Sequence, residues 1–399
     1  MSAPRQKILI TGLGAVSAAG IGVAETLLSF EEGKRNAGRV TIFESELEYP
    51  VFEVRTIPPE FSLNNQRTLS LALVAVDEAL QDASLGKSEL SRLRLGVCLG
   101  TTVASQLNDL DFYKSYRTTG SAPMEPVNRY VKGNLAEFVA RRINPDALSL
   151  TVVNACSSGT DAIGVALAWL KSGFCDIVIS GGADELSPIP LCGFGSLGIV
   201  SHDLCSPFDK DRRGLNLGEG AGILIMETEE SAGKRGKRSD LYALGYASAS
   251  DAYHLTSPRP DGRGLEAAIL RALACSNLHP ESIDFVNAHG TATIENDKVE
   301  GRVLAKVFGP DLKVLSTKGF TGHTLGAAGG LEAVFTAAGL RHGWIPASIG
   351  FRNRDEGVSI VPVRQKTTLS GSFGLSTSLA FGGNNSALVL GREGWCTVL

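Results

Sequence analysis

The sequence predicts an α/β protein with a large layered core. Short apolar runs alternate along the chain with stretches rich in Ala and Leu. The short runs are apolar throughout instead of alternating with polar residues, which is typical of strands that are buried on both faces. Because 43% of the 399 residues are hydrophobic and 20% are charged, a largely disordered chain is excluded, and the length favours two or three structural units.

Eight of these runs are the candidate strands. They are, in chain order, KILITGLG (7–14), RLGVCLG (94–100), LSLTVVNA (148–155), CDIVISGGAD (175–184), AGILIME (221–227), FVNAHG (285–290), KVLSTKG (313–319) and NSALVLG (385–391). Two stretches between them, Arg67–Asp82 and Gly159–Leu170, are candidate helices. The second stretch is apolar on every side, so we expect it to be buried inside the protein.

A basic segment past the middle of the chain, AGKRGKRSD at 232–240, suggests a division into two halves. It is interpreted as a solvated linker between 1–240 and 241–399, although such a run can also attract an acidic partner. Each half has a strand that leads into small residues around a reactive side chain and then into a helix: NACSSG in the first, KVLSTKG followed by GHTLGAAGG in the second. This echo predicts a duplicated unit with its site where the halves meet.

Charge, hydropathy and cysteine content exclude several classes of protein. A net charge of −4 argues against a general nucleic-acid binder, and no apolar run reaches the ~18 residues of a membrane-spanning helix. The first residues superficially resemble a secretory signal, but Thr11, Gly12 and Gly14 interrupt the apolar stretch, so a first strand is the preferred interpretation. Seven cysteines without a CxxC or Cys/His pattern predict a reduced, cytoplasmic protein without a metal site.

Cys156 is the candidate nucleophile. It stands at the expected start of the central helix, followed by Ser157, Ser158 and Gly159. Backbone N–H groups at a helix start favour thiolate over thiol, and the small neighbours leave room for a substrate carbonyl. The alternative is a buried free cysteine that serves as a small hydrophobic residue, and this interpretation suits the other six cysteines.

Two of the six histidines, His289 and His323, are candidate catalytic residues. Each follows an expected strand and enters a turn rich in Gly and Thr, NAHGTAT and FTGHTLGAAGG. A single histidine of this kind would more often be structural, but two of them beside a poised cysteine favour a catalytic role. The other four histidines, at positions 202, 254, 279 and 342, are expected to be structural or on the surface.

Three glycine-containing segments carry weaker signals. LAFGGNNSALVL, at 379–390, places Phe381 beside two glycines, and its N–H groups can line an oxyanion site or simply form a β-turn. TGLGAVS, at 11–17, imitates the start of a dinucleotide-binding fingerprint, but no acidic residue is placed to close the unit. GFGSLG does not satisfy the serine-hydrolase pattern.

Five motifs, in this order, resemble those of the elongating β-ketoacyl-acyl carrier protein synthases of the thiolase superfamily. They are NACSSGTDAIGVA at the nucleophile, DLCSPFDKDRRGLNLGEGAGILIME, NAHGTATIENDKVE at the first histidine, STKGFTGHTLGAAGGLEA at a lysine and the second histidine, and AFGGNN. The resemblance covers almost the whole chain. It implies a thiolase-like, duplicated α/β fold of five layers, αβαβα. The implied activity is that of a 3-oxoacyl-[acyl carrier protein] synthase in fatty-acid, polyketide or polyene elongation.

The resemblance also implies roles for the catalytic set. Cys156 takes an acyl chain from an acyl carrier protein thioester, and His289 and His323, as neutral imidazoles, donate hydrogen bonds to the carbonyl of a malonyl thioester. The enolate that forms as the malonyl carboxylate leaves then attacks the acyl-cysteine. The backbone N–H groups of Cys156 and Phe381 are expected to hold the oxyanion, and Phe381 to act as a gate to the acyl tunnel.

By the same resemblance, Lys318 is expected to neighbour His323 and to pair with Glu332, which would orient the second imidazole and help to keep it neutral. Thr291 and Thr293 are expected to hydrogen-bond the pantetheine arm. No cofactor and no metal is implied, because the substrates are carried on the phosphopantetheine of acyl carrier protein.

The implied partners are acyl carrier protein and a second subunit, with no nucleic acid and no membrane span. The subunit is either a second copy of this chain or a ketosynthase-like partner. Residues near 100–110 and the strand before Cys156 are expected at the interface.

Related families differ at single positions. Initiating synthases carry Asn where His323 stands, and thiolases have a second reactive cysteine in the last glycine loop, where this chain has Phe381 and Asn384. Chain-length-factor partners lack the nucleophile, whereas Cys156 is present here. Two alternatives stay open: a non-condensing subunit of a heterodimeric ketosynthase, and a thiolase that acts on coenzyme A esters.

Four places depart from the family pattern: Asp161, Ile294, Ala380 and the loop GTTVASQ at 100–106, which resembles the region that lines the acyl tunnel. They leave open the natural acyl chain and the choice between housekeeping fatty-acid synthesis and a specialised pathway. Of these two, they favour the specialised pathway slightly. They do not affect the predicted reaction.

Overall fold

The computed structural model describes residues 7–102 and 109–393, so part of the expected acyl-tunnel loop at 100–106 lies outside the described residues. Among these residues, one hydrogen-bonded sheet contains the strands in the order β4-β3-β5-β6-β1-β7-β13-β12-β8-β9, with β2 on β1, and β10 and β11 form a separate pair. The strands are β1 (Ile8–Ser17), β2 (Gly20–Ile21), β3 (Leu95–Gly100), β4 (Leu148–Val152), β5 (Ile177–Asp184), β6 (Gly220–Thr228), β7 (Leu241–Ser250), β8 (Phe285–Asn287), β9 (Lys313–Leu315), β10 (Trp344–Ile345), β11 (Thr367–Thr368), β12 (Phe373–Ala380) and β13 (Asn384–Arg392).

The helices are α1 (Val23–Glu32), α2 (Arg67–Asp82), α3 (Lys87–Leu90), α4 (Leu110–Thr119), α5 (Glu125–Lys132), α6 (Leu135–Ile143), α7 (Ser158–Lys171), α8 (Pro188–Ser196), α9 (Glu229–Lys234), α10 (Arg263–Ser276), α11 (Ile294–Phe308), α12 (Lys318–Thr321) and α13 (Ala328–His342). In the described part of the chain, none of them has both the length and the apolar character that a membrane-spanning helix requires.

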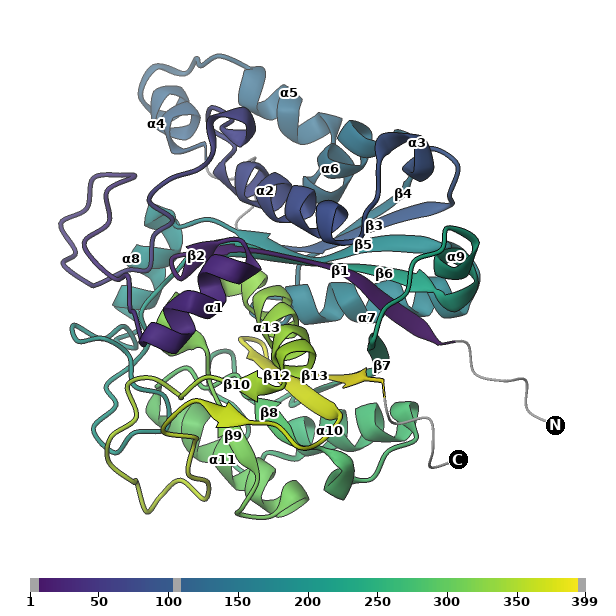
Figure 1. Cartoon of the computed structure of the whole chain (residues 1–399). Helices are drawn as coiled ribbons and strands as arrows, with labels where there is room; N and C mark the ends of the chain where they lie inside the picture. Colours follow the sequence, from purple (N-terminus) through teal and green to yellow (C-terminus); the bar gives the residue numbers. More distant parts are fainter. Residues whose placement is uncertain (1–6, 103–108, 394–399) are drawn as a thin grey trace.

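The main helices and strands stack in five layers (Figure 1). Helices α2 and α6 cover the outer face of the first five strands, α7 and α13 lie between the two sets of strands, and α10 and α11 cover the opposite outer side. Separate clusters of buried hydrophobic side chains fill the spaces between these layers. This is the αβαβα arrangement of the thiolase-like fold, as the sequence predicts.

The two sets of strands repeat one topology. In the first set, β3 pairs in parallel with β4 and β5, while β6 is antiparallel to β5 and β1. In the second set, β8 pairs in parallel with β9 and β12, while β13 is antiparallel to β12 and β7. A central helix follows the edge strand of each set, α7 after β4 and α13 after β9. The internal echo in the sequence therefore corresponds to two copies of one unit.

The two central helices approach each other at glycines. A Cβ added to Gly159 of α7 would lie 2.7 Å from the backbone nitrogen of Gly330 in α13. A Cβ added to Gly330 would lie 2.5 Å from the Gly222 carbonyl oxygen in β6. Only hydrogen at these positions allows the helices and the sheet to pack this closely. The packing brings the start of α7, which follows Cys156, beside the first turn of α13.

All eight candidate strands are present, and α2 begins and ends at the expected residues. Helix α7 is buried along most of its length, as its apolar sequence predicts. Sequence reasoning missed β7 and β12, whose sequences LYALGYASAS and FGLSTSLA are rich in Ser, Gly and Ala. In β12, four of the six buried positions carry Gly, Ser or Thr and only Leu375 and Leu379 are large and apolar, so hydrophobicity alone does not reveal the strand.

The segment 232–240 joins the two halves and much of it is exposed, as expected for a solvated linker, but two of its basic side chains are bound to the first half. Its first residues end α9, the Arg235 guanidinium pairs with the buried Glu227 carboxylate, and Lys237 donates to the Asp82 carbonyl at 2.6 Å. The physical reason is Glu227, because a carboxylate buried in β6 requires a cation or several hydrogen-bond donors.

Candidate active site

Cys156 lies in a strained turn between β4 and α7. Ala155, directly before it, has a left-handed backbone with φ of 49°, a conformation that costs a residue with a side chain on the order of 1–3 kcal/mol. Hydrogen bonds hold the turn: the Asn154 N–H donates to Ser158 Oγ at 2.8 Å, and Ser158 Oγ donates to the Ala155 carbonyl at 2.6 Å. Backbone strain that surrounding bonds maintain is typical of functional sites.

Burial opposes ionisation of the Cys156 thiol. Cys156 is only 5% exposed, and burial raises the pKa of its thiol to about 11. The Lys318 ammonium and a hydrogen bond from the Phe381 N–H lower this pKa and so act in the opposite direction. Burial thus works against the thiolate that the start of the helix is expected to favour.

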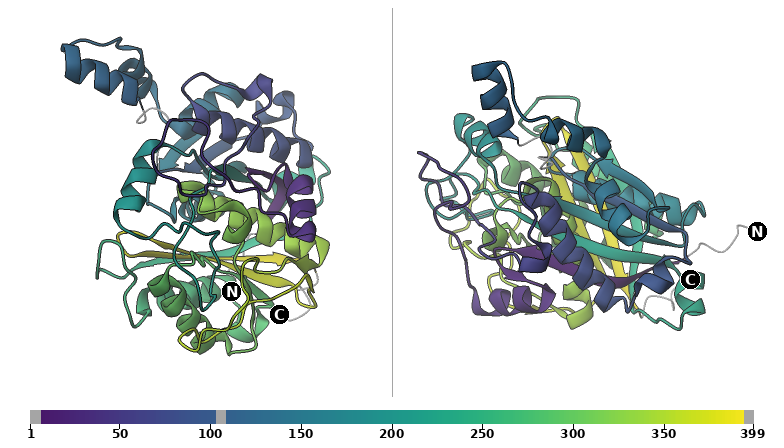
Figure 2. Two further views of the ribbon diagram at one scale, coloured as in Figure 1. Left: turned by 90° about the vertical axis from the view of Figure 1, so that its left-hand side faces the viewer. Right: turned by 90° about the horizontal axis from the view of Figure 1, so that it is seen from above.

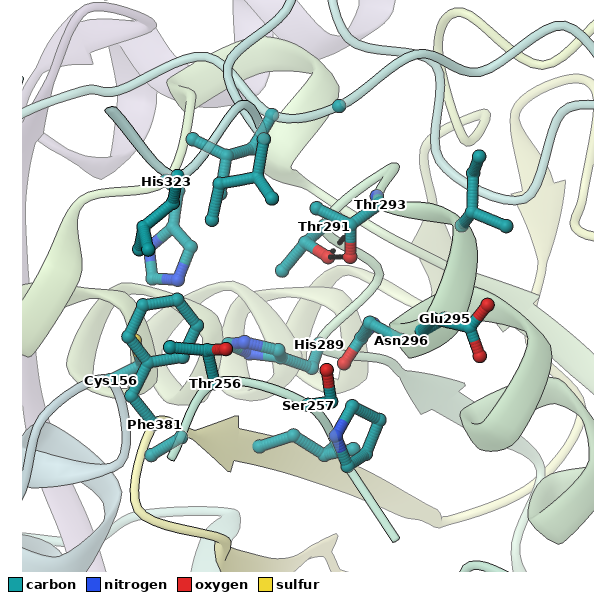
Figure 3. A pocket seen from close by; sticks show the side chains of 18 of the residues that line it. Cys156, Thr256, Ser257, His289, Thr291, Thr293, Glu295, Asn296, His323 and Phe381 are labelled. Atoms are coloured by element: carbon teal, nitrogen blue, oxygen red, sulfur yellow. Dashed lines mark hydrogen bonds between the residues drawn. The ribbon is translucent and has the colours of Figure 1, made fainter. Parts of the chain in front are cut away.

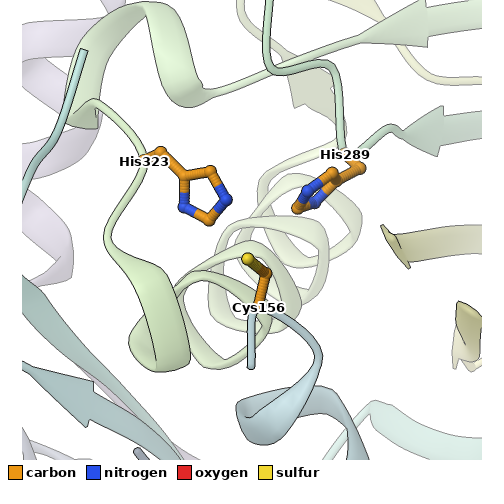
Figure 4. Close-up of side chains that lie close together, drawn as sticks. All are labelled: Cys156, His289 and His323. Atoms are coloured by element: carbon orange, nitrogen blue, oxygen red, sulfur yellow. The ribbon is translucent and has the colours of Figure 1, made fainter. Parts of the chain in front are cut away.

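His289 and His323 face this thiol from two elements of the second set (Figure 4). His289 follows β8, and His323 follows the short helix α12. The Cys156 sulfur and one ring nitrogen of each histidine all lie within 4.8 Å of one another. The two ring centroids are 5.2 Å apart, and the rings are nearly perpendicular. A substrate atom between the rings can therefore reach both imidazoles and the sulfur. The other four histidines are exposed, as expected.

Lys318 makes its direct contacts with the first histidine, His289, and it also lies close enough to His323 for its charge to lower the pKa of that imidazole. Its ammonium donates to the His289 carbonyl at 2.6 Å and lies 3.2 Å from His289 Nδ1. It also forms a buried ion pair with Glu332 of α13.

Hydrogen bonds fix the tautomer of each imidazole. The Leu325 N–H donates to His323 Nδ1 at 3.1 Å, and the Lys318 ammonium, which can only donate, faces His289 Nδ1. Nδ1 is therefore an acceptor in both rings, and the proton is on Nε2. Burial lowers the pKa of both histidines well below its usual value, and the charge of Lys318 lowers it further. Each neutral ring thus keeps one Nε2–H to donate to a substrate.

By ligand chemistry, Cys156, His289 and His323 also suit a soft metal ion such as Zn²⁺. The electrostatics oppose a cation, however, because the Lys318 ammonium lies 3.2 Å from His289 Nδ1. The same positive charge favours a substrate group that is negative or becomes negative during reaction. The arrangement therefore suits the stabilisation of an anion.

Glu300, which sequence reasoning did not single out, stabilises the turn that follows β8 and carries His289. This buried carboxylate of α11 accepts hydrogen bonds from the His289 and Gly290 N–H groups, both at 2.8 Å, and from Thr377 Oγ1 at 2.7 Å. Glu300 ends the motif NAHGTATIENDKVE, so the only sequence signal for it is its place in that motif. Its effect is to fix the backbone that carries His289.

Phe381 lies in the hairpin between β12 and β13. Its ring stacks on Phe194 of α8, with centroids 5.2 Å apart and an interplanar angle of 14°. Gly382 and Gly383 follow with φ of 87° and 81°, left-handed conformations that glycine adopts at little cost. Sequence reasoning identified the Phe381 hairpin but missed Phe194, because PIPLCGFGS carries no motif that marks a site.

Most of the candidate residues line one cavity of about 270 Å³ (Figure 3), whereas Lys318 and Glu332 do not reach its wall. Thr291 and Thr293 lie on its wall, and their hydroxyls are 2.8 Å apart. Thr256 and Ser257 add further hydroxyls. The cavity extends from the buried thiol to exposed residues such as Ile294, so it gives a flexible chain access to the sulfur from solvent.

Together, fold and site define a condensing enzyme of the acyltransferase type. Comparison with known proteins agrees with this class. Residues 5–232 match the family of β-ketoacyl synthase N-terminal domains, and residues 242–352 match the corresponding C-terminal domains. The chain belongs to the β-ketoacyl synthase family, as its motifs predict.

Relatives of known name resemble the chain over nearly its whole length. A 3-oxoacyl-[acyl-carrier-protein] synthase 2 from Synechocystis is 33% identical over 96% of this chain and 97% of the relative. A solved structure of the ishigamide ketosynthase/chain length factor has a TM-score of 0.92 and 31% identity, covering 98% of this chain and 100% of that one. A second solved structure is a type II polyketide acyl-carrier protein in complex with its ketosynthase, bound to the hexaketide. It has a TM-score of 0.88 and 26% sequence identity, and the match covers 98% of this chain and 100% of that one.

Proposed function

We propose that this protein is a 3-oxoacyl-[acyl carrier protein] synthase that joins an acyl thioester to malonyl-acyl carrier protein with loss of CO₂. The observation that carries the proposal is one thiol and two neutral, N–H-donating imidazoles within 4.8 Å of one another. Condensation with decarboxylation requires this combination, because it needs a nucleophile for the acyl chain and donors for an enolate. The named relatives support the same activity.

In the first half-reaction, the Cys156 sulfur attacks the carbonyl of an acyl-acyl carrier protein. A bond forms between Sγ and the acyl carbon, the bond to the pantetheine sulfur breaks, and pantetheine leaves as a thiol with the proton that Cys156 gives up. The N–H groups of Cys156 and Phe381 stabilise the oxyanion. Because the pKa of the thiol is raised to about 11, we expect its proton to depart during the attack.

In the second half-reaction, the Nε2–H groups of His289 and His323 donate to the thioester carbonyl of malonyl-acyl carrier protein. The bond to the carboxylate breaks, CO₂ leaves, and the electron pair forms an enolate. The enolate carbon attacks the acyl-cysteine, the new carbon–carbon bond replaces the bond to sulfur, and Cys156 recovers a proton from solvent. The product is a 3-oxoacyl chain two carbons longer.

The remaining assignments belong to the same proposal. Thr291 and Thr293 hold the pantetheine arm, and the site residues divide between two halves, 1–240 with the nucleophile and 241–399 with the histidines. Acyl carrier protein supplies both substrates, so the reaction needs no further cofactor. A cytoplasmic location agrees with the free thiols of Cys98, Cys156, Cys175, Cys192 and Cys205.

The test is mass spectrometry of Cys156 after incubation with defined acyl-acyl carrier proteins of several chain lengths, with Cys156→Ala as the control. We expect an acyl group on Cys156, and a 3-oxoacyl product with release of CO₂ once malonyl-acyl carrier protein is added. Acylation without condensation, or a reaction only with coenzyme A esters and without CO₂ release, would contradict the proposal. The range of chains accepted identifies the natural substrate class.

A further inference from the structure

Asp161 is a buried carboxylate of α7 that the mechanism above does not use. It lies five residues after Cys156 and is 6% exposed. Four side chains donate hydrogen bonds to its two oxygens. They are Asn154 Nδ2 at 2.5 Å, Ser157 Oγ at 2.8 Å, Tyr246 OH at 2.7 Å and the hydroxyl of Ser386.

Two of these donors come from the nucleophile turn of the first half, and two come from strands of the second set. Asn154 and Ser157 belong to the nucleophile turn and bond Oδ2, whereas Tyr246 of β7 and Ser386 of β13 bond Oδ1. Charge-assisted hydrogen bonds of this kind are shorter and stronger than those between neutral groups, and they restrain both partners. Asp161 therefore ties the nucleophile turn of the first half to strands of the second.

The network continues to the Phe381 hairpin through two amides. Asn384 opens β13 three residues after Phe381, and its Nδ2 donates to Asn154 Oδ1 at 2.6 Å. The Asn154 side chain thus accepts a bond from the hairpin while it donates a bond to Asp161. One continuous path of hydrogen bonds joins Asp161, the turn and the hairpin.

We propose that Asp161 is a positioning residue that sets the relative placement of the two oxyanion donors. One donor is the Cys156 N–H in the turn, and the other is the Phe381 N–H in the hairpin, so their spacing depends on contacts between the two halves. The turn needs an external restraint, because Ala155 before Cys156 has a left-handed φ of 49°. The Asp161 network supplies this restraint, so that both N–H groups meet one carbonyl oxygen.

This inference rests on the proposed function, and three reactions test it. Acyl transfer to Cys156 develops an oxyanion, alkylation of Cys156 by iodoacetamide develops none, and malonyl decarboxylation depends on the two histidines. In Asp161→Asn we expect acyl transfer to slow by about tenfold or more, since losing an oxyanion donor outright costs about a hundredfold. Alkylation and decarboxylation should keep the rates of the unmodified protein.

Two further variants separate positioning from folding. Asn384→Ala removes the link between turn and hairpin but leaves the Asp161 network in place, so it should slow acyl transfer selectively and to a smaller extent. Thr160→Val is the matched control: Thr160 neighbours Asp161 on α7, is also buried, and bonds Ser378 of β12 at 2.8 Å instead of the turn or hairpin. All three reactions should be unchanged in Thr160→Val.

The outcomes are distinct. An equal loss of all three reactions in Asp161→Asn would make Asp161 merely structural and overturn the inference. If Asp161→Asn does not fold, Asn384→Ala decides, and unchanged acyl transfer in that variant overturns the inference. If the unmodified protein accepts no acyl group at all, the proposed function fails instead.

Discussion

Burial and the ammonium of Lys318 together suppress protonation of the histidine pair. Burial holds the pKa of His289 and His323 well below the usual value, and the charge of Lys318 lowers it further. Protonation at Nδ1 would remove the acceptor that the Leu325 N–H uses on His323 and place a second cation beside Lys318 at His289. The neutral form is therefore the active one, and activity should persist on the acid side of neutrality.

Substitution Lys318→Met should reduce decarboxylation and also move the acid limb of its pH profile to higher pH. The sign follows from the charge: without the ammonium, the pKa of both imidazoles rises towards its usual value, so the neutral rings are lost earlier as pH falls. Lys318→Arg keeps the charge and should keep the acid limb of the unmodified protein. If the acid limb falls at the same pH in the unmodified protein, in Lys318→Met and in Lys318→Arg, burial alone sets the pKa of both histidines.

The two histidines should affect one half-reaction only. His289→Ala or His323→Ala should still permit acyl transfer to Cys156 but should slow malonyl decarboxylation by about a hundredfold, the usual cost of one oxyanion-type donor. Single-turnover acylation and CO₂ release, measured separately, provide the check. An equal loss in both steps would mean that the imidazoles act on the nucleophile.

At this scale, the motifs place the reactive residues, but their neighbours depend on the fold. Cys156 stands out because small polar residues follow it, yet burial by the second half sets the pKa of its thiol. The resemblance places Lys318 near His323, but only the folded structure shows that its direct hydrogen-bonding partner is His289. Phe194 and the role of Asp161 depend on contacts between segments far apart in the sequence, which local patterns do not contain.

At the scale of elements, strands rich in Val, Ile and Leu are visible in the sequence, whereas β7 and β12 are not. Ser, Gly and Ala interrupt the larger apolar residues of both strands, so neither strand forms a continuous apolar run. Gly159 and Gly330 mark where α7 and α13 meet, a pairing that becomes apparent only once the two units are stacked.

Gly159→Ala should therefore destabilise the protein. The added Cβ would lie 2.7 Å from the backbone nitrogen of Gly330, so the backbone would have to move. Overpacking of this kind typically lowers the free energy of unfolding by about 1–3 kcal/mol. Gly193→Ala in α8 is the matched control, because its Cβ would meet no atom within 4 Å and alanine stabilises an open helix position by up to about 1 kcal/mol. In urea unfolding, the midpoint should fall for Gly159→Ala and rise for Gly193→Ala. A similar shift of the midpoint in both variants would contradict the packing argument.

The stacked rings of Phe194 and Phe381 should restrict the acyl chain. An aromatic pair contributes about 0.5–1.5 kcal/mol beyond its buried area, so Phe194→Leu should free the Phe381 ring and broaden the range of chain lengths that acylate Cys156. Ala380→Gly, before the same ring, should have a similar effect by loosening the strand side of the hairpin. The measurement is the acylation rate across a series of chain lengths, and an unchanged profile in both variants would exclude a gate.

At the scale of the whole molecule, the described part of the chain leaves one apolar edge strand of the sheet exposed. β4 ends the sheet, and Leu148, Leu150 and Val153 beside it are 44%, 41% and 67% exposed. An apolar edge strand with unpaired backbone groups tends to pair with another chain. In addition, α4, which buries none of its residues, stands away from the layered body (Figure 2). Both features favour a second subunit against this side of the first half.

We therefore expect a dimer at micromolar concentration, and Leu150→Asp should shift it towards the 42.0 kDa monomer in light scattering. The reason is that a carboxylate at the centre of the edge would have to be buried without a partner. Leu270→Asp in α10 is the matched control, because Leu270 is 44% exposed but lies in the opposite outer layer, and it should leave the dimer intact. Equal dissociation in both variants would contradict an interface at β4. A monomer in the unmodified protein would instead require a ketosynthase-like partner to cover the edge, and co-expression with such a partner should then restore the dimeric mass.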